Sequence, residues 1–222
     1  TLQNGREIGL ATIAFVNQKK NGQTYSAADI VVEGFEEVDF YFLERIYQRK
    51  HGIPWRVIET ERTYLREMTV EDVEALYEIY AQEGMTDFIE PLCEKREDEI
   101  AYTKAYIENM YVYYGYGMWL VCDRENGEII GRAGLNTQEI EDEIVLEMGY
   151  LIRQEYQRQG YAYEVCTAIM DYAKEASGFS ELSCLVEEEN HPSLGLLQKL
   201  GFSFRKEVDI LGKRMKRYVY AL

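Results

Sequence analysis

The residues best suited to chemistry form the stretch Gln157-Arg158-Gln159-Gly160-Tyr161-Ala162, which joins a strand-like run to an amphipathic helix. Unpaired backbone N–H groups and the positive end of the helix dipole can hold a pyrophosphate at such a helix start. Gly160 removes a Cβ, Ala162 keeps the next helical position small, and Arg158 adds a positive charge. The pattern predicts an anion-binding loop, and an ordinary strand-to-helix turn is the alternative.

Two further motifs flank this loop. Upstream lies Leu146-Glu147-Met148-Gly149-Tyr150-Leu151-Ile152, and downstream lie Asn190-His191-Pro192-Ser193 and Lys199-Leu200-Gly201-Phe202. With the loop written as Gln/Arg-x-x-Gly-x-Gly/Ala, this order resembles the GNAT superfamily of acyl-CoA-dependent N-acetyltransferases over residues 61–222. It looks most like the branch that acetylates ribosomal-protein N-termini and related amines, in which a Glu-x-Gly-Tyr strand precedes the loop.

The resemblance implies an α/β fold with a mixed, mostly antiparallel central sheet flanked by helices. It also implies acetyl-CoA as the donor, with CoA as product, and places the pyrophosphate on the loop residues Gln157, Arg158, Gln159, Gly160, Tyr161 and Ala162. The strand backbone at Tyr150, Leu151 and Ile152 would pair with the pantetheine arm like an added β-strand. A backbone N–H there would also stabilise an oxyanion.

An amine acceptor needs a base, because an amine with a pKa of ~10.4 is about 99.9% ammonium at pH 7 and has no free lone pair. Glu147 is the leading candidate, since it lies in the strand before the loop, where the resemblance places the base. A surface or salt-bridged glutamate is the alternative. For an N-terminal α-amine, with a pKa of ~7.7–8.0, the base contributes less.

Asn190 and Ser193 open the next predicted helix. Asn190 fits a helix cap whose amide also bonds the pantetheine, and Ser193 is either a cap residue or a cofactor contact. Many superfamily members place a Tyr seven residues after this Asn to protonate the leaving thiolate, but Leu197 stands here. The general acid is unassigned, and water is an alternative, because a thiol with a pKa of ~8.5 leaves readily as the thiolate.

Periodicity predicts the elements that position these groups. Strands are predicted over Thr63–Met68, Met118–Cys122, Ile129–Leu135, Ile144–Ile152, Leu182–Val186, Phe204–Ile210 and Met215–Tyr220. Helices are predicted after a Thr69/Asp72 capping box, over about Glu97–Tyr113, after Gly160, and from Pro192 to Gly201. Residues 136–142 read as a connection, and four aromatic residues read as packing residues: Tyr116, Trp119, Tyr161 and Tyr163.

The formal charge of −16 opposes binding to a polyanion and excludes a nucleic-acid substrate. Acidic residues gather in Glu83–Glu99, Glu139–Glu143 and Glu187–Glu189. These stretches would attract a cationic acceptor, either a small molecule or a protein N-terminus, and ordinary solvated surface is the alternative.

No apolar run approaches the ~20 residues that cross a bilayer, and no cationic leader precedes an apolar segment. We therefore expect no membrane association and a cytoplasmic location. With two histidines and no C-x-x-C pair, neither a metal site nor disulfides are expected. The four cysteines are Cys93, Cys122, Cys166 and Cys184.

Residues 1–52 differ from the rest. Ala11–Val16 and Ile30–Val32 read as short strands, and Val38–Tyr47 is apolar at helical spacing. Gly9-Leu10, Ala28-Asp29-Ile30-Val31-Val32 and Phe35-Glu36-Glu37 resemble the last strand-helix unit of haloacid-dehalogenase-like phosphatases. No Asp-x-Asp nucleophile motif occurs, so this piece cannot be that enzyme alone.

The predicted organisation is a partial hydrolase-like remnant over 1–52, a linker over 53–60 and a GNAT domain over 61–222. Because the chain opens on Thr1, we expect a fragment of a phosphatase–acetyltransferase fusion. Apolar residues of the remnant would pack on the acetyltransferase domain or on a second copy, as in a homodimer. A non-catalytic acyl-CoA-binding module and a scaffold are the alternatives to an enzyme.

Overall fold

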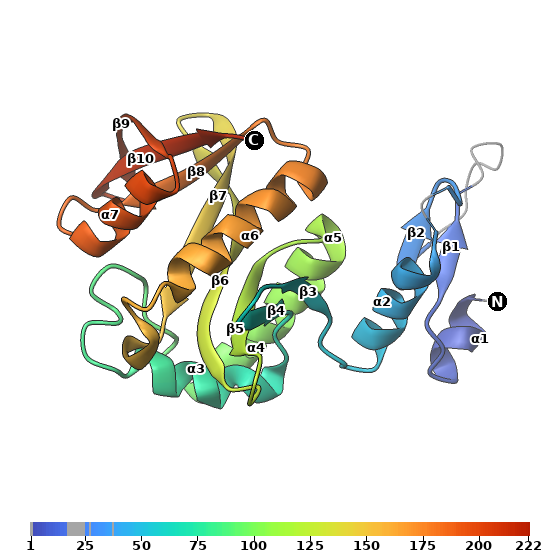
Figure 1. Cartoon of the computed structure of the whole chain (residues 1–222). Helices are drawn as coiled ribbons and strands as arrows, with labels where there is room; N and C mark the ends of the chain where they lie inside the picture. The colour runs from blue at the N-terminus through green and yellow to red at the C-terminus, as the bar shows by residue number, and fades with distance from the viewer. Residues whose placement is uncertain (1, 17–24, 27, 37) are drawn as a thin grey trace. The chain divides into compact units, whose positions relative to one another are not determined.

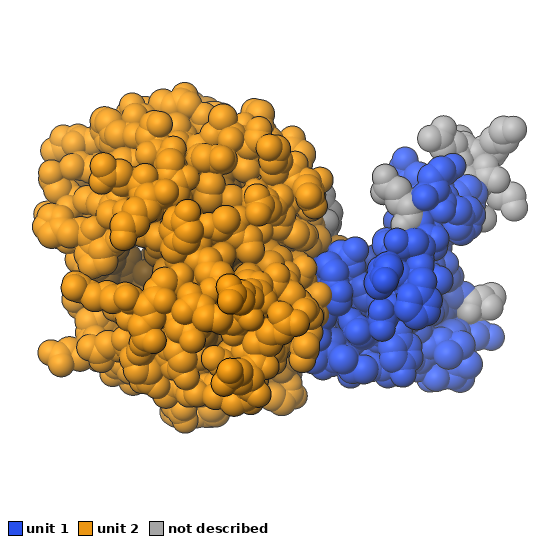
Figure 2. Space-filling model, viewed as in Figure 1, with its two compact units in different colours: residues 1–55 blue, residues 56–222 orange. Residues whose placement is uncertain are grey.

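The computed structural model describes residues 2–16, 25–26, 28–36 and 38–222. These residues fall into two compact units, 1–55 and 56–222, which Figure 2 colours separately. Glu37, part of the expected N-terminal helix entry, lies outside the described residues. In the described part of the chain, no helix is both long and apolar enough to cross a membrane.

The larger unit contains all the elements around the motifs. Its strands are β3 (Arg56–Glu59), β4 (Thr63–Arg66), β5 (Met118–Asp123), β6 (Ile129–Ile140), β7 (Glu143–Ile152), β8 (Glu181–Val186), β9 (Ser203–Ile210) and β10 (Lys213–Ala221). Its helical segments are η1 (Val70–Asp72), α3 (Val73–Tyr80), α4 (Arg96–Tyr106), η2 (Ile107–Tyr111), α5 (Val112–Tyr114), η3 (Gln154–Tyr156), α6 (Tyr161–Ala176) and α7 (His191–Lys199).

These strands form one eight-stranded sheet in the order β3-β4-β5-β6-β7-β8-β10-β9 (Figure 1). Every neighbouring pair is antiparallel except β7 and β8, which run parallel. The predicted fold class, a mixed and mostly antiparallel sheet flanked by helices, is confirmed. Strand β3 was not predicted and occupies part of the segment expected as a linker over 53–60.

Helices cover both faces of the sheet, as side-chain alternation along the strands shows. Trp119 in β5 is fully buried and its ring meets Tyr172 of α6 edge-on, with ring centres 5.2 Å apart. Arg132 in β6 is next to Ala133, the register partner of Trp119, and its guanidinium lies over the Tyr106 ring of α4. Helix α6 therefore packs on one face, and α4 packs on the other.

The β6–β7 hairpin is longer than predicted. Its ladder runs from Gly131 opposite Ile152 to Ile140 opposite Glu143. The two loop residues, Glu141 and Asp142, have φ values of 50° and 67°, as a two-residue hairpin turn requires. The prediction of a connection over residues 136–142 was wrong, because Glu-Asp is a weak local signal for that turn and the long ladder supplies the missing stabilisation.

The helix predicted over about Glu97–Tyr113 is interrupted by the π-helical segment η2. The extra residue in this turn lets two phenols reach the start of β5: the Tyr106 hydroxyl accepts from Met118 N at 2.7 Å, and the Tyr111 hydroxyl donates to Met118 O at 2.5 Å. Gly117 permits this approach, since a Cβ there would lie 2.8 Å from the Tyr111 ring. These contacts fix Tyr106 beside the sheet.

The smaller unit contains α1 (Leu2–Glu7), β1 (Ile13–Phe15), β2 (Ile30–Val32) and α2 (Phe40–Lys50), with β1 and β2 paired in parallel. The carboxylate of Asp29 joins its parts: it accepts from the Thr12 N–H and hydroxyl, both at 2.8 Å, and pairs with Lys50 Nζ at 3.0 Å. Asp39 caps α2 by accepting from Phe42 N at 2.7 Å. The strands and helix predicted here are present with slightly different ends.

Candidate active site

A cavity of about 880 Å³ lies where the three sequence motifs meet. It is lined by residues from the start of α6, the end of β7, the start of α7 and the segment between α3 and α4. The lining residues are Gly84, Met85, Phe88, Ile89, Tyr150, Leu151, Ile152, Gln157, Arg158, Gly160, Ala162, Tyr163, Asn190, His191, Pro192, Ser193, Gly195, Leu196 and Lys199.

The predicted anion-binding loop enters α6 through a left-handed turn. Arg158 has φ 58° and Gly160 has φ 87°, and Gly160 is the N-cap of α6. The first N–H groups of a helix have no partner within it, so α6 offers donors and its positive dipole end at this point. Arg158, Gly160 and Ala162 line the cavity, where such donors suit an anion.

Three other loop residues serve the loop itself. The amide of Gln157 lines the cavity but donates to Ile152 O at 2.8 Å. The Gln159 amide donates to Glu155 O at 2.5 Å, and the Tyr161 ring packs edge-on against Tyr156. Gln159 and Tyr161, expected as cofactor contacts, are thus not among the residues that line the cavity.

Strand β7 changes its surroundings along its length. It pairs with β8 at Leu146 and Glu147, opposite Leu182 and Ser183, and at no other described residue. Beyond Glu147 the side of β7 that faces away from β6 has no strand paired to it in the described structure. Tyr150, Leu151 and Ile152 line the cavity along this open edge.

Glu147 lies at the last position where β7 pairs with β8. It is opposite Asn136 of β6, whose amide oxygen accepts from the Tyr106 hydroxyl at 3.1 Å. Burial without a cationic neighbour raises the pKa of Glu147 to about 7. Glu147 is half-buried and, among the described residues, forms no salt bridge; it is not part of the cavity lining.

A pair of hydroxyl groups, one from α7 and one from β7, lies at the cavity. Asn190 caps the helix by accepting from Ser193 N at 3.2 Å. The Ser193 hydroxyl lies 2.6 Å from the Tyr150 hydroxyl, and burial raises the pKa of Tyr150. Leu197, at the position where many relatives have a tyrosine, is fully buried in the core. Tyr150 was expected to contribute only its backbone, and its hydroxyl was missed.

The acidic stretch Glu83–Glu99 supplies apolar cavity walls as well as charge. Met85, Phe88 and Ile89 line the cavity, while Glu99 is buried and accepts from Cys93 N at 2.9 Å. The other six carboxylates of the stretch are exposed, and they belong to Glu83, Asp87, Glu90, Glu94, Glu97 and Asp98. Both readings of this stretch, solvated surface and acceptor attraction, therefore concern these six side chains and not Glu99.

The other two acidic stretches are ion-paired with neighbouring strands. Lys206 pairs with Glu141, and the buried Arg217 pairs with Glu143 at 2.9 Å. Lys213 pairs with Glu187 at 2.6 Å, and Lys216 pairs with Glu188 at 2.8 Å. These ion pairs compensate four of the seven carboxylates in the two stretches. The segment between α3 and α4 is the acidic stretch that contributes residues to the cavity lining.

Several residues near the site were not singled out from sequence. Lys199 adds a positive charge to the lining and His191 adds an imidazole. Both lie in motifs that were quoted, so position in those motifs was the available signal. Tyr163, expected to pack, is 47% exposed and lines the cavity. Arg62 contacts the loop from the turn before β4, and nothing in the local sequence indicates that contact.

All four cysteines are free, and Cys122, Cys166 and Cys184 are buried. The described part of the chain holds no group of three or more His, Cys, Asp or Glu arranged to bind a metal ion.

Comparison with known families and relatives places this site in context. The family described as "Acetyltransferase (GNAT) domain" matches residues 62–203. "Uncharacterized protein YkkB" of Bacillus subtilis (strain 168) is 30% identical over 105 residues, which is 47% of this chain and only 61% of that protein. "Uncharacterized N-acetyltransferase YoaA" of the same organism is 29% identical over 148 residues, or 66% of this chain and 82% of that one.

Solved structures share the fold. An acetyltransferase from Agrobacterium tumefaciens has a TM-score of 0.62 at 23% identity and covers 74% of this chain and 94% of its own. The ribosomal L7/L12 alpha-N-protein acetyltransferase RimL has a TM-score of 0.64 at 14% identity, over 76% of this chain and 95% of its own. RimL in complex with coenzyme A has a TM-score of 0.61 at 15% identity, over 73% and 96%.

Proposed function

Because this chain belongs to the GNAT acetyltransferase family, we propose that it transfers an acetyl group from acetyl-CoA to a primary amine. One observation carries the proposal: a single cavity joins the helix start at Gly160, the open edge of β7 and the helix start at Asn190. The amine attacks directly, in a complex that holds donor and acceptor together.

The cavity suits acetyl-CoA in size and chemistry. Its volume of about 880 Å³ is in the usual range for small-molecule sites, roughly 300–1,000 Å³. The N–H groups at the start of α6, together with Arg158 and Lys199, suit the phosphates, and the backbone of Tyr150–Ile152 suits the amides of pantetheine. When bound, acetyl-CoA supplies an acetyl group activated as a thioester.

Glu147 is the proposed base that takes a proton from the acceptor ammonium, directly or through a water. A pKa of about 7 suits that role, because the carboxylate is then present at neutral pH and is still basic enough to accept a proton. The Tyr106–Asn136 hydrogen bond beside it supplies a fixed polar wall on the same side of the sheet.

Tyr150 is the proposed source of the proton that CoA needs on departure. Its raised pKa keeps the phenol protonated at neutral pH, and its hydroxyl lies 2.6 Å from Ser193 Oγ, from which the proton can be replaced. Ser193 is one helical turn before Leu197 on α7. A hydroxyl from β7 would thus serve where relatives use a tyrosine from this helix.

The acceptor is proposed to be a cationic amine, either small or at a protein N-terminus. The exposed acids between α3 and α4 support this, since they border the apolar residues Met85, Phe88 and Ile89 of the cavity wall. The fold of RimL, described as a ribosomal L7/L12 alpha-N-protein acetyltransferase, supports a protein N-terminus. A cytoplasmic location suits such an acceptor.

For residues 1–55 we propose a hydrolase-derived remnant that lacks catalytic groups. The parallel β1–β2 pair followed by α2 supports this reading, because parallel strands normally belong to larger sheets covered by helices. Exposed Phe35, Phe40 and Tyr41 support its association with a second copy. The domain division predicted from sequence is kept here, with β3 assigned to the acetyltransferase domain.

A non-catalytic acyl-CoA-binding module is the second candidate, and the burial of Leu197 at the usual tyrosine position favours it. One experiment separates the two. CoA binding is measured by calorimetry, and acetyl-CoA consumption is measured over N-terminal peptides, lysine peptides, polyamines and amino sugars. Turnover with any amine that falls sharply in Glu147→Gln supports the enzyme; CoA binding without turnover on any class supports the binding module.

A further inference from the structure

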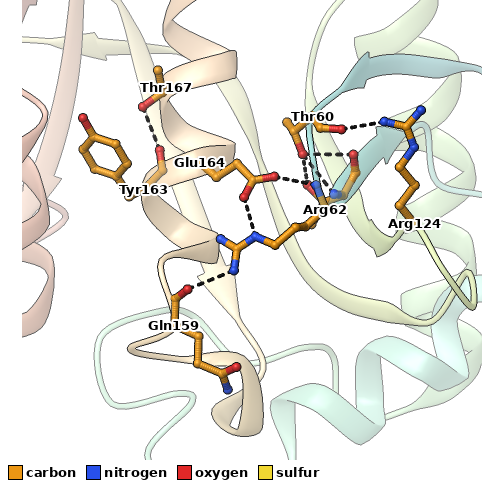
Figure 3. Close-up of polar contacts among 8 residues, drawn as sticks. Thr60, Arg62, Arg124, Gln159, Tyr163, Glu164 and Thr167 are labelled. Atoms are coloured by element: carbon orange, nitrogen blue, oxygen red, sulfur yellow. Dashed lines mark hydrogen bonds and ion pairs between the residues drawn. The ribbon is translucent and has the colours of Figure 1, made fainter.

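Arg62 connects the start of the sheet to the anion-binding loop, although the two are 97 residues apart. It lies in the turn between β3 and β4. Its Nη1 donates to the Gln159 carbonyl at 3.0 Å, and its Nε donates to Glu164 Oε2 of α6 at 2.7 Å (Figure 3). Its guanidinium carbon lies 4.1 Å from the centre of the Tyr161 ring. Arg62 thus contacts three residues around the loop.

Glu164 holds Arg62 from two sides. Its other carboxylate oxygen accepts from the Arg62 backbone N–H at 2.8 Å. Burial would raise the pKa of Glu164, but the hydrogen bonds with Thr60 and Arg62 outweigh it and keep this pKa below its usual value. The hydrogen bond to Glu164 in turn raises the pKa of Arg62. The pair is therefore fully charged at neutral pH, so the guanidinium stays in place.

The loop needs such support because its backbone is unfavourable. Arg158, with φ 58°, is a non-glycine residue in the left-handed region, which is sterically unfavourable for L-amino acids. Gly160, with φ 87°, leaves room for Arg62: a Cβ at Gly160 would lie 3.4 Å from Arg62 Nη2. Without a partner for the Gln159 carbonyl between them, the loop could rotate to a more relaxed conformation.

The orientation of one peptide plane links this contact to the cavity. All described peptide bonds are trans, so the carbonyl of Gln159 and the N–H of Gly160 point in opposite directions. While Arg62 holds the carbonyl, the Gly160 N–H faces away from Arg62. Gly160 itself lines the cavity. Rotation of this plane would remove a donor from the place where a pyrophosphate would bind.

We propose that Arg62 is a positioning residue for the cofactor: by holding the Gln159 carbonyl, it presents the Gly160 N–H to the pyrophosphate. The proposal rests on the proposed function, because it concerns the same acetyl-CoA site. Arg62 does not act here as a free positive charge, since Glu164 neutralises it. Its effect is on the conformation of the loop before any ligand arrives.

Arg124 provides a matched control. It approaches the same turn from the other side, where its Nη1 donates to Thr60 O at 2.9 Å (Figure 3). Its Nη2 also pairs with Glu59 at 3.4 Å. No contact joins it to the loop among the described residues. Arg124→Ala therefore removes a similar surface hydrogen bond and charge without touching Gln159.

The experiment measures the Kd of CoA by calorimetry and amide hydrogen exchange of residues 158–162 without ligand, in the full chain. Arg62→Ala should raise the Kd about tenfold, which corresponds to ~1.4 kcal/mol, and should speed exchange of the loop amides. Arg62→Lys keeps the charge but lacks the planar guanidinium that bonds both acceptors through separate nitrogens, and should fall between Arg62→Ala and the wild type. Arg124→Ala should bind CoA within about twofold of wild type.

A Kd within about twofold of wild type in Arg62→Ala would overturn the proposal, whether or not its thermal stability falls, because the residue would then be structural only. If Arg62→Ala does not fold, the CoA affinities of Arg62→Lys and Glu164→Gln test the proposal instead. Unchanged CoA affinity in both variants would overturn it. Failure of the wild-type chain to bind CoA would refute the proposed function. Unchanged loop exchange in the Arg62→Ala apo protein would refute the inference alone.

Discussion

The two halves of strand β7 differ in what lies beside them. The half that ends at Glu147 is paired with β6, and its last two residues, Leu146 and Glu147, are also paired with β8. It carries the Glu147 carboxylate, whose pKa is raised by burial. The half from Met148 to Ile152 is paired only with β6 in the described structure, and its last three residues line the cavity. One strand thus combines the carboxylate proposed as the base with the open edge proposed to bind the cofactor.

Two neighbouring stretches of one continuous strand are thus proposed to have different roles, one in catalysis and one in cofactor binding. Burial raises the pKa of Glu147 at the end of the β8 pairing, whereas the loss of one neighbouring strand beyond it frees backbone groups for an amide-bearing ligand. Variants of the paired half should therefore change kcat, and variants of the cavity end should change the affinity for CoA.

The largest effect is expected for Glu147→Gln. Removing the proposed base should lower kcat by about 10²–10⁴-fold and leave the Kd of CoA unchanged. Wild-type kcat/KM should rise with pH through about 7, because the carboxylate must lose its proton before it can accept one from the amine. The variant should lose this rise. Steady-state kinetics from pH 5.5 to 8.5 measure both.

Glu139→Gln is the control for that variant, since Glu139 is an exposed residue of the same hairpin. Its kcat and pH profile should match the wild type. Full kcat in Glu147→Gln at neutral pH would mean that another group is the base, and the two halves of β7 would no longer differ in role.

Gly160→Glu should affect cofactor binding and not the base. The new side chain meets a φ of 87° and the Arg62 guanidinium, and its charge would repel the pyrophosphate. We expect the Kd of CoA to rise well over tenfold, more than ~1.4 kcal/mol. Gly178→Glu is the matched control, because Gly178 also has a positive φ, 72°, but has open space around it and lies outside the cavity lining. Unchanged CoA affinity in a folded Gly160→Glu protein would remove the basis for the proposed site.

Tyr150→Phe should have a smaller effect. It tests whether the two stretches of β7 differ in role, because Tyr150 lies in the open half of the strand but is proposed to donate a proton to the departing CoA. Loss of its hydroxyl should lower kcat by roughly tenfold, at the low end of acid–base contributions, with CoA affinity within twofold. Tyr163→Phe removes the hydroxyl of another cavity-lining tyrosine and should have no effect on kcat. If both variants behave alike, water is the better candidate for the acid.

The smallest effect is expected from removing residues 1–54. The acetyltransferase domain should fold, bind CoA and turn over acetyl-CoA at the wild-type rate, because the proposed groups all lie within 56–222. The cut must precede β3, which pairs with β4. A start near Thr60 would remove that strand. A truncated protein that folds and binds CoA but has no turnover would place part of the active site in the N-terminal unit.

Much of the site could be predicted because its signals are local. The loop around Gly160, the Asn190 cap and the order of strands and helices follow from residue types a few positions apart, and the structure has them at nearly the same bounds. Local signals failed at the Glu141-Asp142 turn and at β3, where the strand partner decides the conformation.

Sequence alone indicated the candidate groups: the helix start at Gly160 for a pyrophosphate and the strand residue Glu147 for a proton. It also showed Leu197 at the position where the resemblance would place a tyrosine. Tertiary structure decided which of them meet. The Tyr150–Ser193 pair joins residues 43 positions apart, and the Arg62–Gln159 contact joins residues 97 apart. The pKa of Glu147 also depends on strands from elsewhere in the chain, because burial is a property of the assembled sheet and not of the residues beside it.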